Sequence, residues 1–128
     1  MLETEKTIKT IPSYEVAKMM ERKHAKVLKM LEGETYKDGR TKVVGIIPVL
    51  TEARTRVSEY FIESTYKDES GKTNKCYECT KLGCDMLANK MTGEKGILFT
   101  ARYVKRFKDG VDIIDLKTYT SAVSVLNL

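Results

Sequence analysis

The sequence predicts a single α+β domain, and three observations carry this prediction. Helical periodicity with end signals marks residues 13–33, a run rich in β-branched and aromatic residues marks a hairpin over 60–80, and helical periodicity returns over 81–108. The chain has 128 residues, 41% of them hydrophobic, which is enough for one core and too little for two domains. We therefore expect one domain over 1–128 that ends in a tail over 110–128.

The first helical stretch reads as two short helices. Ser13 follows a proline and is expected to cap a helix that runs from residue 14 to about 20. After a polar break at 21–23, a second helix is expected over 24–32, with Gly33 as its C-terminal cap. The inward positions of the pair are Val16, Ala17, Met20, Val27, Leu28 and Leu31.

The remaining elements follow from turn and capping signals. Residues 34–58 predict mainly a loop, with a turn at 37–39, one short strand and one helical turn. The two strands of the 60–80 hairpin flank a cluster of turn formers, and Thr80 is expected to cap a helix that reaches about residue 91. A last helix, to residue 108, is expected to place Ile97, Ala101 and Val104 on one face. The tail alternates apolar and polar residues over 111–113 and 122–128, which suggests strand character.

Charge and composition narrow the class of partner. The net charge is +5, which favours an anionic partner such as nucleic acid. The three cysteines are an odd number and suggest a reducing compartment, and the N-terminus lacks the apolar segment of a secretory signal. The longest apolar run, 43–50, is too short to cross a bilayer, so no membrane association is expected.

Two short helices joined by a three-residue turn are typical of a helix-turn-helix, and a hairpin downstream fits the wing of a winged-helix-like domain. The second helix would then read DNA from its first turn, and the hairpin would hold the backbone. The same pattern also fits two amphipathic surface helices with solvated lysines. The expected DNA contacts are Arg22, Lys23, His24, Lys26 and Lys29 of the helix pair and Lys67, Lys72 and Lys75 of the hairpin.

The sequence gives little support for a catalytic site or a metal site. His24 is the single histidine, so a site with several histidine ligands is excluded. Cys76 and Cys79 fall three apart on an expected strand, which points them to opposite faces, and with Cys84 they read as buried thiols. Gly71-Lys72-Thr73 lacks the earlier glycine of a phosphate-binding loop. We expect no enzyme, no cofactor and no metal.

The last helix carries more apolar residues than one buried stripe needs. We expect Leu98, Phe99, Tyr103 and Phe107 to form an interface, and the protein to be a homodimer. The alternative is that these aromatic residues pack inside the domain, as most aromatic residues of a small domain do.

Several motifs together resemble one family. They are Phe61-Ile62-Glu63-Ser64-Thr65-Tyr66, Cys76-Tyr77, Thr80, Gly83-Cys84-Asp85-Met86, the run from Ala88 to Gly96, and Phe99-Thr100-Ala101, preceded by Ser13 with Glu15-Val16-Ala17 and the His24 region. Over residues 11–109 the chain resembles the phage regulatory protein Rha family. The resemblance implies a phage or prophage protein of the host bacterial cytoplasm, with a winged-helix-like DNA-binding region and a link to integration host factor. Cys79 departs from it, because an aliphatic residue is expected there.

Two functions follow from this sequence. The first is a phage or prophage transcriptional regulator that binds double-stranded DNA through a helix-turn-helix and a wing. The second is a phage-encoded inhibitor that binds a host defence or replication protein. DNA binding requires Arg22, Lys23, Lys26 and the hairpin lysines to lie on one continuous face.

Overall fold

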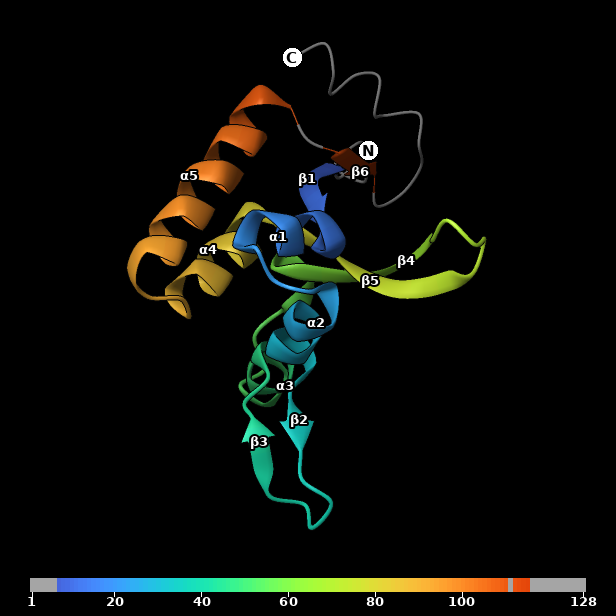
Figure 1. Ribbon diagram of the computed structural model, residues 1–128, viewed down its shortest axis with the longest axis vertical. Coiled ribbons are helices and arrows are strands. Elements are labelled where there is room, and N and C mark those ends of the chain that lie inside the picture. Colours follow the sequence, from blue (N-terminus) through green and yellow to red (C-terminus); the bar gives the residue numbers. More distant parts are fainter. Residues whose placement is uncertain (1–6, 111, 116–128) are drawn as a thin grey trace.

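The computed structural model describes residues 7–110 and 112–115 and has a mixed α+β architecture (Figure 1). Five α-helices and a short 3-10 helix accompany two antiparallel sheets in the described part of the chain. The helices are α1 (Ser13–Met20), α2 (His24–Glu32), α3 (Ile46–Glu52), α4 (Lys81–Asn89) and α5 (Gly93–Asp109), and the 3-10 helix is Val57–Glu59.

The larger sheet has four strands in the order β4-β5-β1-β6. Their bounds are β1 (Thr7–Pro12), β4 (Phe61–Lys67), β5 (Thr73–Thr80) and β6 (Asp112–Asp115). The expected hairpin is therefore confirmed as β4–β5, whereas β1 lies where the sequence predicted no strand. The expected strand at the start of the tail corresponds to β6, and the expectation for 122–128 lies outside the described residues.

The register of this sheet places a row of apolar residues under the helices. Ile11 pairs with Cys79, and Cys79 pairs with Phe61, so the three side chains lie side by side on one face. None is more than 2% exposed. Together with the buried residues of α1, α2, α4 and α5 they form one core cluster.

The core confirms the inward stripe of the first two helices but corrects that of α5. Val16, Ala17, Met20, Val27 and Leu31 are buried, and Leu28 is partly buried. On α5, the buried residues are Phe99 and Tyr103, whereas Ile97 is 70% exposed and Val104 42%. Phe99 and Tyr103 lie one turn apart with ring centroids separated by 4.8 Å.

The two aromatic residues fill the space between α5 and its neighbours α1 and α4, so they are not available to a dimer interface. Phe107 is partly buried against the core, and Leu98 is 37% exposed. Of the four expected interface residues, two therefore belong to the interior.

The helix ends follow the predicted caps at two places and not at a third. Gly33 ends α2 with a φ of +84°, and the Thr80 hydroxyl accepts a hydrogen bond of 3.1 Å from the Gly83 N–H at the start of α4. Ser13 was expected to cap α1, but Pro12 occupies the cap position and Ser13 lies in the first turn. Its hydroxyl is turned toward β5 instead.

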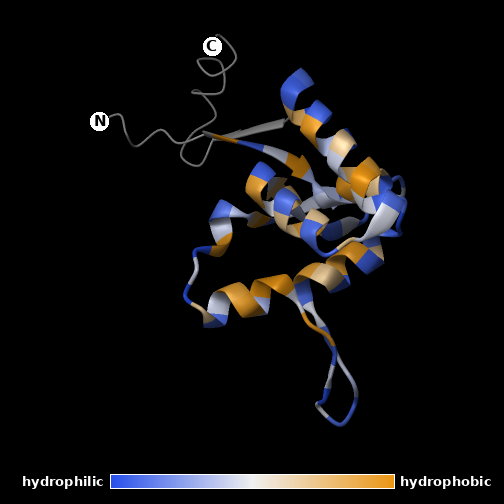
Figure 2. Ribbon diagram, turned by 90° about the vertical axis from the view of Figure 1, so that its left-hand side faces the viewer, coloured by the Kyte–Doolittle hydropathy of each residue, from blue (hydrophilic) through white to orange (hydrophobic). Residues whose placement is uncertain are grey.

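Residues 34–58 contain more structure than the sequence predicted. A second hairpin, formed by β2 (Glu34–Thr35) and β3 (Thr41–Val43), follows α2 directly, and the turn predicted at 37–39 lies at its tip. Figure 1 shows this hairpin and β4–β5 extending from the helices in different directions. In Figure 2 the tip of β2–β3 is hydrophilic, and its base, where it meets the helices, is hydrophobic.

Candidate nucleic-acid interface

The N-terminal end of α2 is held by a buried network centred on Ser13. The Ser13 hydroxyl lies 2.8 Å from His24 Nε2 and accepts a hydrogen bond of 2.9 Å from the backbone N–H of Tyr77. The His24 ring packs edge-on against Tyr14 and Tyr66, with centroids 6.2 and 5.9 Å apart. Burial lowers the pKa of His24, because desolvation disfavours the imidazolium.

His24 was expected to read DNA, and the structure gives it another position. Its ring is half-buried between α1 and the β4–β5 hairpin, so it orients α2 rather than presenting a donor to solvent. Nothing in the neighbouring sequence indicates this packing, because the Tyr66 that contacts His24 lies 42 positions away.

The opposite side of α2 carries a basic hollow of about 750 Å³. Lys26 and Lys29 lie three positions apart on α2 and therefore share one face, and Arg22 and Lys23 reach the same hollow from the turn before the helix. Neither Lys23 nor Lys26 has an acidic partner within the described residues, and Arg22 donates to the Met30 sulfur at 3.2 Å. The hollow is lined by Arg22, Lys23, Lys26, Lys29, Met30, Glu34, Lys42 and Val43.

Sequence reasoning missed Lys42 as a member of this site. It reaches the hollow from β3, and Glu34 lies 3.9 Å from its Nζ and 3.4 Å from that of Lys29. Both lysine side chains remain about half exposed, at 48% and 49%. Exposed ion pairs of this kind are weak, so a phosphate group can replace the carboxylate.

The lysines expected on the wing do not join this hollow. Lys75 donates to the Glu32 carboxylate at 2.7 Å, and the Tyr77 hydroxyl donates to the same oxygen at 2.7 Å. Burial alone would raise the pKa of Glu32, but these hydrogen bonds and the Lys75 charge outweigh it and hold the pKa below its usual value. Lys75 therefore ties β5 to the end of α2.

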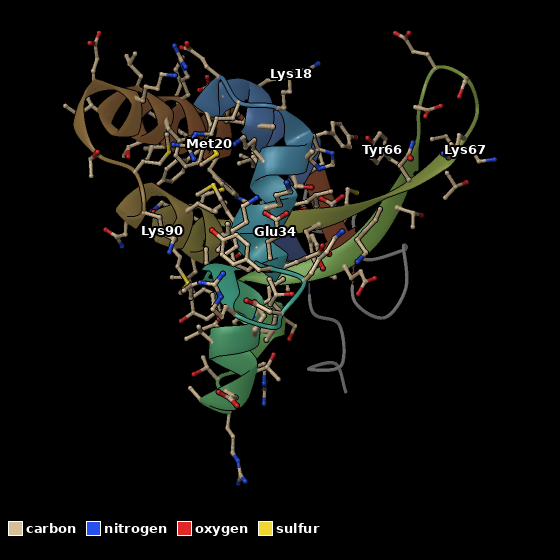
Figure 3. All side chains as sticks on the ribbon, turned by 60° about the horizontal axis from the view of Figure 1, so that its bottom comes forward. Lys18, Met20, Glu34, Tyr66, Lys67 and Lys90 are labelled. Atoms are coloured by element: carbon tan, nitrogen blue, oxygen red, sulfur yellow. The ribbon has the colours of Figure 1, made fainter. Side chains whose placement is uncertain are left out.

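Lys67 and Lys72 are exposed on the β4–β5 hairpin, which meets α2 on another side. Tyr66 of this hairpin packs on His24, and His24 lies about 200° around the helix from Lys26. Figure 3 shows Tyr66 and Lys67 on the extended hairpin, to one side of Glu34. The continuous face that DNA binding through helix and wing was expected to require is therefore not formed, and a DNA contact at α2 would have to rest on the cations of the hollow without these hairpin lysines.

In a second basic stretch, residues 81–110, four of the seven basic side chains form ion pairs with acidic residues of the described part of the chain. This stretch holds seven basic and three acidic residues, as does the segment 22–43. Its paired side chains are Lys81 with Asp85 at 3.3 Å, Arg102 with Glu21 at 3.0 Å, Lys105 with Asp109 at 3.0 Å and Arg106 with Glu15 at 2.6 Å. In the hollow beside α2, Lys29 and Lys42 share Glu34, whereas Lys23 and Lys26 have no acidic partner within the described residues.

The cysteines lie in the interior. Cys76, Cys79 and Cys84 are all free and buried. Burial raises the pKa of Cys79 well above its ordinary value and that of Cys84 to about 12, which disfavours the thiolate that would bind a metal. Over 7–110 and 112–115, no group of three or more His, Cys, Asp or Glu side chains is placed to hold an ion. No helix of these ranges is long and apolar enough to span a membrane.

Comparison with known proteins identifies the family to which the chain belongs. The family model described as phage regulatory protein Rha matches residues 11–109, so the chain belongs to that family of phage regulators. A relative from Bacillus subtilis (strain 168), named "SPbeta prophage-derived putative antirepressor protein YoqD", is 41% identical over 99 residues. The match covers 77% of this chain and 35% of the relative, so the chain spans about a third of that protein's length. No solved structure matches the chain.

Proposed function

We propose that the protein regulates phage genes by binding double-stranded DNA, with α1 and α2 as a helix-turn-helix and α2 as the recognition helix. The observation that carries the proposal is the hollow formed by Arg22, Lys23 and Lys26 at the start of α2. In a helix-turn-helix, the first turn of the second helix is the part that enters the major groove. Arginine and lysine there can donate to guanine, and to Lys29, further along the helix, we assign a phosphate contact.

The anchoring of α2 supports this role. Base readout requires that the helix be held at a fixed angle to the rest of the domain, and α2 is held at both of its ends. The Ser13–His24 contact fixes its beginning, and the bonds of Glu32 to Lys75 and Tyr77 fix its end. Membership of a family of phage regulators fits the same function.

The proposal is tested by selecting bound sequences from a random duplex library with the full chain. We expect a discrete motif. Replacing Arg22 or Lys26 by alanine should then weaken binding to that motif by about 1–3 kcal/mol, roughly 5- to 150-fold. Lys90→Ala is the matched control, because this exposed lysine ends α4 and does not line the hollow. Failure to enrich any motif, together with equal affinities of all three variants and the unsubstituted protein, would refute the proposal.

A second candidate function rests on the exposed apolar residues of α5. Ile97 is 70% exposed and Leu98 and Val104 are 37% and 42% exposed, and a contiguous exposed apolar patch can mark a protein interaction site. A host defence or replication protein bound at this helix would make the chain an inhibitor. Isolation of a stoichiometric host protein without DNA from infected cells would favour this function over the first.

The same residues support the proposal of a homodimer, with Ile97, Leu98 and Val104 in place of the buried aromatic residues. A dimer would present two copies of α2 to two half-sites. Light scattering at micromolar concentration tests it, and Ile97→Lys should convert a dimer to a monomer. A monomeric unsubstituted chain would refute it.

A further inference from the structure

The β2–β3 hairpin is joined to α2 without a linker. β2 begins at Glu34, directly after Gly33, and the chain returns to the same point at Gly45. A Cβ on Gly45 would lie 2.4 Å from both the carbonyl carbon of Glu32 and the Gly33 nitrogen. Because the two ends of the hairpin touch the end of α2 backbone to backbone, its direction is fixed relative to that helix.

The basic surface of α2 continues onto this hairpin. Lys29 of α2 and Lys42 of β3 share the carboxylate of Glu34, and both line the hollow described above. The hollow is therefore bounded by the helix on one side and by β3 on the other. A DNA strand whose phosphates lie against α2 would therefore also pass along β3.

The tip of the hairpin carries an oriented guanidinium. The Arg40 guanidinium carbon lies 4.9 Å from the centroid of the Tyr36 ring, a cation–π distance, and Tyr36 is 46% exposed. Arg40 Nε donates to Asp38 at 2.8 Å, and the Arg40 backbone N–H to the same carboxylate at 3.0 Å. Within the described residues the two terminal nitrogens of Arg40 have no partner, and Lys37 beside it is exposed.

The two hairpins differ in net charge. Residues 34–43 hold three basic and two acidic residues, whereas 61–80 hold three basic and four acidic. The tip of β4–β5 is built around the Asp68 carboxylate, which accepts bonds from Ser70, Lys72 and Asn74. An arm that follows a polyanion needs a positive balance. We propose that β2–β3, rather than β4–β5, is the arm that binds the sugar-phosphate backbone of duplex DNA beside α2, an inference that rests on the proposed function.

The test compares two double variants of the full chain, each lacking two cations of one hairpin. Lys37→Ala with Arg40→Ala alters β2–β3, and Lys67→Ala with Lys72→Ala alters β4–β5. Binding to a labelled mixed-sequence duplex of about 30 base pairs is followed by fluorescence anisotropy between about 50 and 200 mM salt. We expect the first pair to reduce the slope of log K against log salt by about 1 to 2, since each phosphate contact contributes about 0.9, and the second pair to leave it unchanged.

The outcomes separate this inference from the proposed function. If the unsubstituted chain shows no salt-dependent binding to the duplex, the proposed function is overturned and the arm with it. If it binds but the two pairs reduce the slope equally, or the β4–β5 pair reduces it more, or neither reduces it, the assignment of the arm alone is overturned. All four side chains are exposed, so urea unfolding midpoints should match that of the unsubstituted protein and confirm that folding is not the cause.

Discussion

Replacing Ser13 by alanine tests how the helix pair is attached to the sheet. Ser13 is fully buried, and its hydroxyl is bonded to the Tyr77 N–H and to His24 Nε2. The strand ladder cannot take over the Tyr77 amide, because β1 ends at Pro12, opposite Glu78. The variant therefore leaves a buried backbone donor without an acceptor.

The expected cost follows from that one donor. An unsatisfied buried amide destabilises by about 1–3 kcal/mol, and His24, which is half-buried, adds less because water can reach its ring. This is a large share of the stability of a small domain, typically ~5–15 kcal/mol. Urea unfolding followed by circular dichroism measures the loss. Ser58→Ala, at an exposed serine of the 3-10 helix, is the matched control and should change stability by less than about 0.5 kcal/mol. Equal stabilities of the two variants would refute this reasoning.

Three further predictions concern titration, packing and thiol chemistry. The folded-state pKa of His24 is lowered below its unfolded value, so the unfolded chain binds the proton more readily as the pH falls through about 6.5. Stability should drop between pH 7.5 and 5.5, and a His24→Gln variant should lose less of it in urea titrations at the two pH values. Gly83→Ala should destabilise by about 1–3 kcal/mol or more, because its Cβ would lie 2.3 Å from the Tyr60 carbonyl oxygen, whereas Gly96→Ala meets its nearest atom at 3.3 Å and should cost less. Burial raises the pKa of Cys84 to about 12, so an aromatic disulfide reagent should modify this thiol only after unfolding; rapid modification of the native protein would contradict its burial.

Local signals determined the elements that the sequence predicted well. The span of α2 and its glycine end, the β4–β5 hairpin and the threonine cap of α4 each depend on residues a few positions apart. Of the missed strands, β1 depends on distant pairing, whereas β2 pairs with the nearby β3. β1 becomes a strand because β5 and β6 flank it, and β2 has only two residues, too few for any periodicity to register.

Helix α5 shows why periodicity alone misplaced its buried face. Ile97, Ala101 and Val104 recur at helical spacing, and so do Phe99 and Tyr103. The two stripes lie on different sides of the helix, and either could face a core. The rings of Phe99 and Tyr103 fill the space that α5 shares with the core, so the aromatic stripe of the helix is buried. The aliphatic stripe is left exposed to solvent.

The candidate site divides in the same way around α2. The sequence places Lys26 and Lys29 on the side of the helix opposite the apolar stripe of Val27, Leu28 and Leu31, and the structure agrees, with Val27 and Leu31 buried and the two lysines lining the hollow. His24 belongs to neither group. A polar side chain in the first turn of a helix can face DNA or another element, and only the position of a distant residue decides between them. In this chain the distant residue is Tyr66, whose ring packs on that of His24, so the histidine side chain faces the β4–β5 hairpin, whereas Lys26 lines the hollow on the opposite side of α2.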